Sequence, residues 1–393
     1  MKKTIAFCSK WFDHEFESMI ASKLEEKFPQ FLFAHVQDSS EHTSLEAWEA
    51  WEKNRGLDIR MDISDEPFFK SKTYDLTPYL KNSGVSLQLF DPDLLKSVSD
   101  EHGIFGLPFS RGTTYTHALF YNANIFAKFD VPPPQHGMTW DEVITLATKV
   151  TGTIDDTSYY GLDIGDSALL KMQMGIRFLD PETHQPILRE SNCEEYFRII
   201  KGAYGIPGNI QDTEERIFIY GRAFRRNGNV AMSIDSPEMF TRKLSFELGA
   251  VNFPQIDSTL RVPSLNDGGW FLTLHPESQQ KEEVFEVIAY LVSEEFQLYQ
   301  TKLGRFSSLT GKKYEKEYGQ ETPSFSGINM EWVFGGTKVG WPNPQSPYEY
   351  MVGSIVKEEM ERAVRKYTLW DEAIEIMENR IREKLTTELH IDA

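Results

Sequence analysis

Short apolar runs alternate with amphipathic stretches at the start of this chain. Residues 5–8, 31–36 and 56–63 have the composition of buried strands, and residues 13–27 and 45–53 carry apolar side chains at helical spacing. Strands that alternate with helices form mostly parallel sheets covered by helices, with right-handed crossovers. The pattern therefore predicts an α/β fold.

Later segments continue the same alternation. Residues 230–234 and 248–251 are short apolar runs typical of strands, and residues 281–299 and 346–385 carry helical patterns. Thr139 is placed to cap a helix that reaches residue 150. A chain of 393 residues is too long for one small core, so roughly two or three domains are expected.

The charge of the chain argues against two classes of partner. A formal net charge of -19 repels both nucleic-acid phosphate and anionic lipid headgroups, and the sequence shows no basic patch that would override it. We therefore expect no nucleic acid partner. Cys8 and Cys193 lack the spacing of a metal or redox motif, and both are interpreted as small buried hydrophobic residues.

The first residues resemble the start of a secretion signal but do not complete one. Two lysines follow Met1, yet residues 4–8 are too short for the apolar core of a signal peptide. Apolar runs of the roughly 20 residues needed to span a bilayer are also missing from the sequence. We expect a soluble polypeptide; if it is exported, its leader is not part of this sequence.

Familiar catalytic signatures are absent from the sequence. It contains no G-x-S-x-G elbow, no phosphate-binding loop, no H-E-x-x-H pair and no G-x-G-x-x-G turn, and its nine histidines are scattered. Sixty acidic residues allow a glycosidase carboxylate pair to be assembled anywhere, which makes any one pair uninformative. We expect no metal and no cofactor.

Several aromatic residues in the predicted loops stand beside Asp, Asn, Ser or Gly. They are Trp11, Phe12, Phe68, Tyr115, Trp270, Trp332 and Trp341. A sugar ring has apolar C–H faces and polar edges, so a carbohydrate site combines an aromatic platform with planar polar groups. The competing interpretation is that each tryptophan covers a hydrophobic core.

Several motifs occur in the order found in one protein family. They are YDLTPYL at 74–80, HGIFGLPF at 102–109, LFYNANIF at 119–126, VPPP at 131–134, TWDE at 139–142, GNVAM at 228–232 and the segment 268–274. Together they resemble the family 1 extracellular solute-binding proteins, the sugar-binding lipoproteins of bacterial ABC importers. The resemblance spans about residues 4–385 and departs from the family at the N-terminus, where no lipidated cysteine is present.

The resemblance implies two α/β lobes joined by hinge crossovers, with a ligand cleft between them. The N-terminal lobe is expected over residues 1–110 and 268–320, and the C-terminal lobe over 111–267 and 321–393. It further implies a monomeric binding protein, not an enzyme. That protein would lie outside the cytoplasm on a lipid anchor, and would deliver a carbohydrate, an oligosaccharide, to the permease subunits of an ABC importer.

The candidate ligand-binding residues lie in the loops after the predicted strands and crossovers, because ligands bind at these loops in open α/β sheets. They are Trp11, Asp13, Asp38, Ser39, Asp65, Glu66, Arg111, Tyr115, Asp235, Ser236, Gly269, Trp270 and Trp341. Each carboxylate could instead cap a helix or lie on the surface. Arg111 could hold the carboxylate of an acidic sugar, or could pair with Asp65 or Glu66.

Two other functions remain open at this point. A carbohydrate-active enzyme, a glycosidase or lyase, could use carboxylates of the cleft. A ligand sensor could use the same fold without a transporter.

Overall fold

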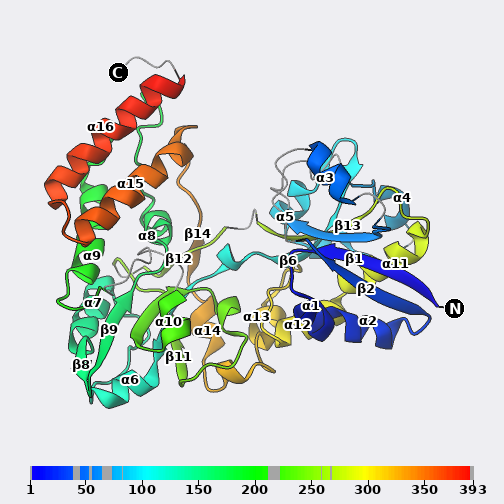
Figure 1. The fold of residues 1–393 in the computed structure, drawn as a ribbon, viewed down its shortest axis with the longest axis horizontal. Helices are drawn as coiled ribbons and strands as arrows, with labels where there is room; N and C mark the ends of the chain where they lie inside the picture. The colour runs from blue at the N-terminus through cyan, green and yellow to red at the C-terminus, as the bar shows by residue number, and fades with distance from the viewer. Residues whose placement is uncertain are drawn as a thin grey trace. The chain divides into compact units, whose positions relative to one another are not determined.

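The computed structural model describes residues 2–38, 45–52, 55–63, 73–81, 83–210, 222–257, 259–265 and 268–389. The chain divides into two compact units (Figure 1). Unit 1 comprises Met1–Tyr115 and Leu265–Pro323, and unit 2 comprises Thr116–Ser264 and Ser324–Ala393. Each unit combines a sheet with covering helices, which confirms the predicted α/β fold class.

Unit 1 is built on a mixed sheet of order β2-β1-β3-β13-β6. Its strands are β1 (Lys3–Ser9), β2 (Phe31–Gln37), β3 (Ile59–Ile63), β6 (Leu107–Arg111) and β13 (Gly269–Leu274). β1 pairs in parallel with β2 and β3, as the βα alternation predicts, whereas β13 runs antiparallel to β3 and β6. The carboxyl ends of three parallel strands therefore meet at one edge.

The helices of unit 1 lie on both sides of this sheet, with α3 and α5 on one side and α1 and α2 on the other (Figure 1). Its α-helices are α1 (Asp13–Phe16), α2 (Ser22–Lys27), α3 (Leu45–Glu52), α4 (Thr77–Leu80), α5 (Pro92–Ser97), α11 (Lys281–Leu291), α12 (Glu294–Lys302) and α13 (Lys312–Glu317). A π-helical turn, Glu17–Ala21, joins α1 to α2. A small hairpin is formed by β4 (Ser99–Asp100) and β5 (Gly103–Ile104).

Unit 2 contains a second mixed sheet, of order β11-β7-β10-β9-β8. Its strands are β7 (Ala118–Asn122), β8 (Gly152–Ile154), β9 (Thr157–Asp163), β10 (Val230–Asp235) and β11 (Leu248–Val251). β9 and β10 are parallel, so Asp163 and Asp235 end adjacent strands on the same side. A separate parallel pair is formed by β12 (Arg261–Pro263) and β14 (Thr337–Val339).

The helices of unit 2 include a long C-terminal pair. Its α-helices are α6 (Ala123–Lys128), α7 (Trp140–Lys149), α8 (Ser167–Met174), α9 (Ser191–Tyr204), α10 (Arg222–Asn227), α14 (Met330–Phe334), α15 (Glu349–Val364) and α16 (Trp370–Leu389). α15 and α16, orange and red in Figure 1, pack side by side.

Capping explains one correct and one wrong prediction. Thr139 caps α7 in a capping box with Glu142, as the sequence predicts. The prediction of one helix over 281–299 is wrong, because α11 ends at Leu291 and α12 begins at Glu294. The Ser293 hydroxyl accepts the Phe296 N–H at 3.3 Å and so starts a new helix, although apolar side chains continue at helical spacing across this position.

Each unit has its own hydrophobic core. Phe7, Phe109 and Ile288 are buried in unit 1, and Trp140, Phe253 and Val356 are buried in unit 2. Cys8 and Cys193 are fully buried free thiols, which confirms their predicted role, and burial raises the pKa of each to about 12. Of the helices that the structure describes, none is long and apolar enough to cross a membrane.

Candidate functional site

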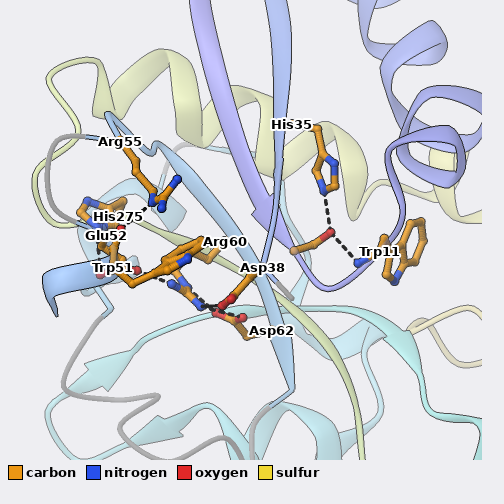
Figure 2. Close-up of polar contacts among 10 residues, drawn as sticks. Trp11, His35, Asp38, Trp51, Glu52, Arg55, Arg60, Asp62 and His275 are labelled. Carbon is orange, nitrogen blue, oxygen red and sulfur yellow. Dashed lines mark hydrogen bonds and ion pairs between the residues drawn. The ribbon is translucent and has the colours of Figure 1, made fainter. Parts of the chain in front are cut away.

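A buried ionic cluster around Arg60, the second residue of β3, lies beside the carboxyl ends of β1 and β2 (Figure 2). The Arg60 guanidinium donates to both carboxylate oxygens of Asp62, at 2.6 and 3.1 Å. It also donates to Glu52 and lies 3.8 Å from the predicted site residue Asp38. Asp38 is buried at the end of β2, so its carboxylate faces this arginine.

The charges of the cluster stabilise one another. Burial alone would raise the pKa of Glu52, but hydrogen bonding from His275 and the charge of Arg60 lower it to about 2. The Glu52 carboxylate therefore stays ionised although it is buried, and its role at this edge of the sheet is structural. Prediction from the sequence missed Arg60, Asp62 and Glu52, although the alternation of β3 places Arg60 and Asp62 on the same side of the sheet.

A chain of hydrogen bonds fixes the loop that follows β1. The Ser9 hydroxyl contacts His35 Nε2 at 2.9 Å, and the opposite ring nitrogen of His35 contacts Asp13 at 2.7 Å. This is the connectivity of a Ser–His–Asp triad. However, Ser9 is 2% exposed and its oxygen accepts the Trp11 N–H, so the hydroxyl is not accessible to a substrate. The predicted residue Asp13 therefore orients His35 and the loop.

Two predicted aromatic platforms of unit 1 lie together. The Trp11 ring is 6.2 Å from that of Trp270 and 6.0 Å from that of Phe109, and Arg305 lies over it at 4.8 Å. Trp11 is only 6% exposed, so it packs in the core, whereas Trp270 is half-buried. Gly269 precedes Trp270 in β13, where a Cβ atom would lie 2.4 Å from a backbone oxygen of β6.

Arg111 is engaged inside unit 1. Its guanidinium donates to the Asp91 carboxylate at 3.2 Å and to the carbonyls of Ser307 and Leu309, and it lies 4.6 Å from the Tyr115 ring. The predicted pair Arg111 and Tyr115 is thus brought together, with Asp91 as the ionic partner. The proposed partners Asp65 and Glu66, and the candidate Ser39, lie outside the described residues.

In unit 2, Asp235 ends β10 beside Asp163 of β9. Asp235 accepts a hydrogen bond from Arg225 and one from the Ser236 N–H at 2.8 Å. Burial raises the pKa of Asp235 to about 7 although Arg225 opposes the shift, and burial also raises the pKa of Asp163. Asp235 and Ser236 are both buried, so neither exposes its side chain to solvent in this structure.

Trp341 lines a cavity of about 400 Å³ that lies entirely within unit 2. A second hollow, of about 490 Å³, adjoins it and shares Trp341, Glu349 and Tyr350. The Trp341 side chain is 38% exposed and that of Tyr350 is 82% exposed, so both rings present apolar surface. Other polar lining residues are Asp166, Lys171, Ser354 and Lys357.

A buried ion pair supports the wall of this cavity. Lys171 Nζ donates to Glu349 at 2.6 Å, and Glu349 also accepts the backbone N–H groups of Phe178 at 2.7 Å and Leu179 at 3.1 Å. Burial lowers the pKa of Lys171 although Glu349 opposes the shift. The ammonium lies 4.1 Å from the Phe178 ring and 5.2 Å from the Trp341 ring, so it holds both aromatic side chains.

Residues of α15 turn one helix face toward the cavity. Tyr350, Gly353, Ser354 and Lys357 all line it, at the spacing of three and four residues that places side chains on one side of a helix. A Cβ atom built on Gly353 would meet nothing within 4 Å. Prediction from the sequence found Trp341 but missed this face, which the helical pattern over 346–385 could have suggested.

The sequence matches the family model described as bacterial extracellular solute-binding protein over residues 64–298. No curated protein matches it. Solved structures with a similar fold include the ABC substrate-binding protein Lmo0181 from Listeria monocytogenes in complex with cycloalternan. Its TM-score is 0.70 at 15% identity, over 98% of this chain and 99% of that one.

Two further structures agree over nearly their whole length. The cyclic alpha-maltosyl-1,6-maltose binding protein from Arthrobacter globiformis has a TM-score of 0.64 at 15% identity, over 98% of this chain and 100% of that one. The sugar-binding protein MalE from Xanthomonas citri has a TM-score of 0.63 at 15% identity, over 99% of each chain. The fold is shared with these proteins, and the family match covers more than half of the sequence, so the chain belongs to the bacterial extracellular solute-binding proteins.

Proposed function

We propose that this protein captures a carbohydrate, an oligosaccharide of a few units, for an ABC importer. The observation that carries the proposal is the cavity of unit 2, which has the aromatic side chains of Trp341 and Tyr350 in its wall. Its volume of about 400 Å³ lies in the range of small-ligand pockets. The cycloalternan complex of the Listeria protein and the cyclic alpha-maltosyl-1,6-maltose after which the Arthrobacter protein is named support the ligand class.

The wall of the cavity offers both kinds of contact that a sugar needs. The Tyr350 ring can stack on the C–H face of a pyranose, and the Ser354 hydroxyl and the Asp166 carboxylate can hydrogen-bond its hydroxyl groups. We propose that the two units are the predicted lobes.

The proposal includes partners and place of action. The protein would act as a monomer outside the cytoplasm, held by a lipid anchor, and would hand its ligand to the permease subunits. We propose binding without turnover, because both oxygens of Glu349 accept protein donors and Asp166 is the one other carboxylate among the described residues that line the cavity, whereas glycoside hydrolysis uses a pair of carboxylates. Incubating the protein with oligosaccharides and measuring new reducing ends or unsaturated products tests this point; product formation would support the enzyme alternative.

Calorimetric titration with mannotriose, maltotriose and cycloalternan tests the proposal. Gly353→Phe should fill the cavity and abolish binding, because the glycine faces open space. Gly353→Ala is the matched control: it should fold at least as stably, since alanine favours a helix by about 1 kcal/mol, and should retain most of the affinity.

Tyr350→Ala separates binding from stability. Its ring is 82% exposed, so its removal should leave the melting temperature unchanged while weakening a bound saccharide about tenfold. If none of the three saccharides releases heat or raises the melting temperature of the wild-type protein, the proposal of a carbohydrate ligand is wrong.

A further inference from the structure

We infer that the carbohydrate bound by unit 2 is uncharged, and that Asp166 is the residue that excludes acidic sugars. This inference rests on the proposed function, because it specifies the ligand of the same cavity. The residues that line the cavity include two lysines and two carboxylates, and these four groups form two pairs.

The first pair is buried and complete. Lys171 and Glu349 are less than 10% exposed and their charged atoms are 2.6 Å apart. Three donors already occupy the Glu349 carboxylate, and the Lys171 ammonium lies against two aromatic rings. A ligand carboxylate could reach this ammonium only by separating a buried pair, which is strongly unfavourable.

The second pair lies in a more open position. Lys357 Nζ is 3.8 Å from one oxygen of Asp166, and the other oxygen caps α8 by accepting the Ala168 N–H at 2.9 Å. At 3.8 Å the ion pair is not a close hydrogen bond, so the oxygen that faces Lys357 can also accept a sugar hydroxyl. A ligand carboxylate that approached Lys357 would meet the negative charge of Asp166.

The charges of the whole molecule act in the same direction. The formal charge of -19 opposes the approach of an oligouronate, whereas a neutral saccharide is unaffected. In unit 1, Arg111 is the arginine predicted to hold a ligand acid, and it binds Asp91 and two carbonyls instead. The described groups therefore favour hydroxyl recognition over carboxylate recognition.

Titrations with matched trisaccharides test the inference. We expect mannotriose or maltotriose to bind the wild-type protein at least 100-fold more tightly than trigalacturonate. We also expect the affinity of the neutral ligand to change less than twofold between 0.02 and 0.5 M salt, because no ligand charge is screened.

Asp166→Asn tests the role of the residue. Asparagine is an equally good helix cap, so α8 should remain intact, but Lys357 would lose its carboxylate partner. The ratio of trigalacturonate affinity to neutral trisaccharide affinity should rise about tenfold. Asp371→Asn removes the same charge from an exposed site of unit 2, in the first turn of α16, and should leave this ratio unchanged.

The outcomes separate the two proposals. If a neutral trisaccharide binds but trigalacturonate binds at least as tightly, the inference of an uncharged ligand is overturned and the proposed function stands. If Asp166→Asn changes the ratio no more than Asp371→Asn, Asp166 is not the discriminating residue. If no saccharide binds at all, the proposed function itself is wrong.

Discussion

Replacing Glu349 by alanine should destabilise unit 2 strongly. The substitution would leave the Lys171 ammonium buried without its carboxylate and would orphan the backbone N–H groups of Phe178 and Leu179. Breaking a buried ion pair by removing one partner costs about 3–5 kcal/mol, and each unsatisfied buried N–H adds to this cost. For a unit of roughly 200 residues, the melting temperature should fall by about 6 to 20 °C.

A double-mutant cycle measured by thermal and urea unfolding isolates the pair. Lys171→Met alone removes the buried cation. The double variant, Lys171→Met with Glu349→Ala, should lose about 2 kcal/mol less unfolding free energy than the sum of the losses of the two single variants. Glu358→Ala is the control: it lies on the same helix, and its pair with Arg380 is half exposed, so the loss should stay within about 0.5 kcal/mol. A loss below about 1 kcal/mol for Glu349→Ala, or strict additivity in the cycle, would refute the reasoning.

Three further predictions concern the buried carboxyl groups of Glu52 and Asp235 and the close backbone contact at Gly161. Glu52→Gln should lower the free energy of unfolding by about 2 kcal/mol at pH 7. The pKa of Glu52 is lowered to about 2, so the difference in unfolding free energy between the variant and the wild type should shrink as the pH falls from about 4.5 to 2. Urea titrations over this pH range measure that difference. Asp235 has its pKa raised to about 7 by burial, so the folded state of the wild-type protein retains a proton that the unfolded state releases above about pH 4. Its unfolding free energy should therefore fall as the pH rises from 4 to 7, and Asp235→Asn should reduce that slope; an unchanged slope would exclude Asp235 as a source of it. Gly161→Ala should lower the melting temperature by several degrees, corresponding to about 1–3 kcal/mol, because a Cβ atom there would lie 2.2 Å from a backbone oxygen at the end of α7.

Local sequence patterns were sufficient for some of the strands and helices of the two units. The apolar runs at 5–8 and 31–36 became β1 and β2, and Thr139 capped α7, because both features depend on neighbouring residues alone. The helix expected over 281–299 divides in two, because the Ser293 hydroxyl caps a new helix although the apolar side chains continue at helical spacing. The antiparallel insertion of β13 between β3 and β6 depends on pairing between distant segments, which no local pattern records.

The candidate site was harder to predict because the type of a residue does not determine which other residues will surround its side chain in the folded protein. Trp11 and Trp341 have similar polar neighbours in the sequence, yet Trp11 packs against Phe109 in the core and Trp341 lines a cavity. Arg111 was predicted to bind a ligand carboxylate or to pair with Asp65 or Glu66, whereas its observed partners, Asp91 and the carbonyl of Ser307, come from other segments of unit 1. Such pairings arise only when the chain has folded.

The proposed binding site of unit 2 separates the groups that stabilise its wall from the groups proposed to contact a ligand. Lys171 and Glu349 are 178 positions apart in the sequence, and their pairing joins α8 to the first turn of α15 while it supports the Trp341 ring. Because these charges stabilise the wall, they are not available to a ligand. The proposed recognition therefore depends on three other lining groups, the exposed ring of Tyr350, the hydroxyl of Ser354 and the carboxylate of Asp166. A change of ligand would therefore be reached most easily through Tyr350, Ser354 or Asp166, and least easily through the buried pair.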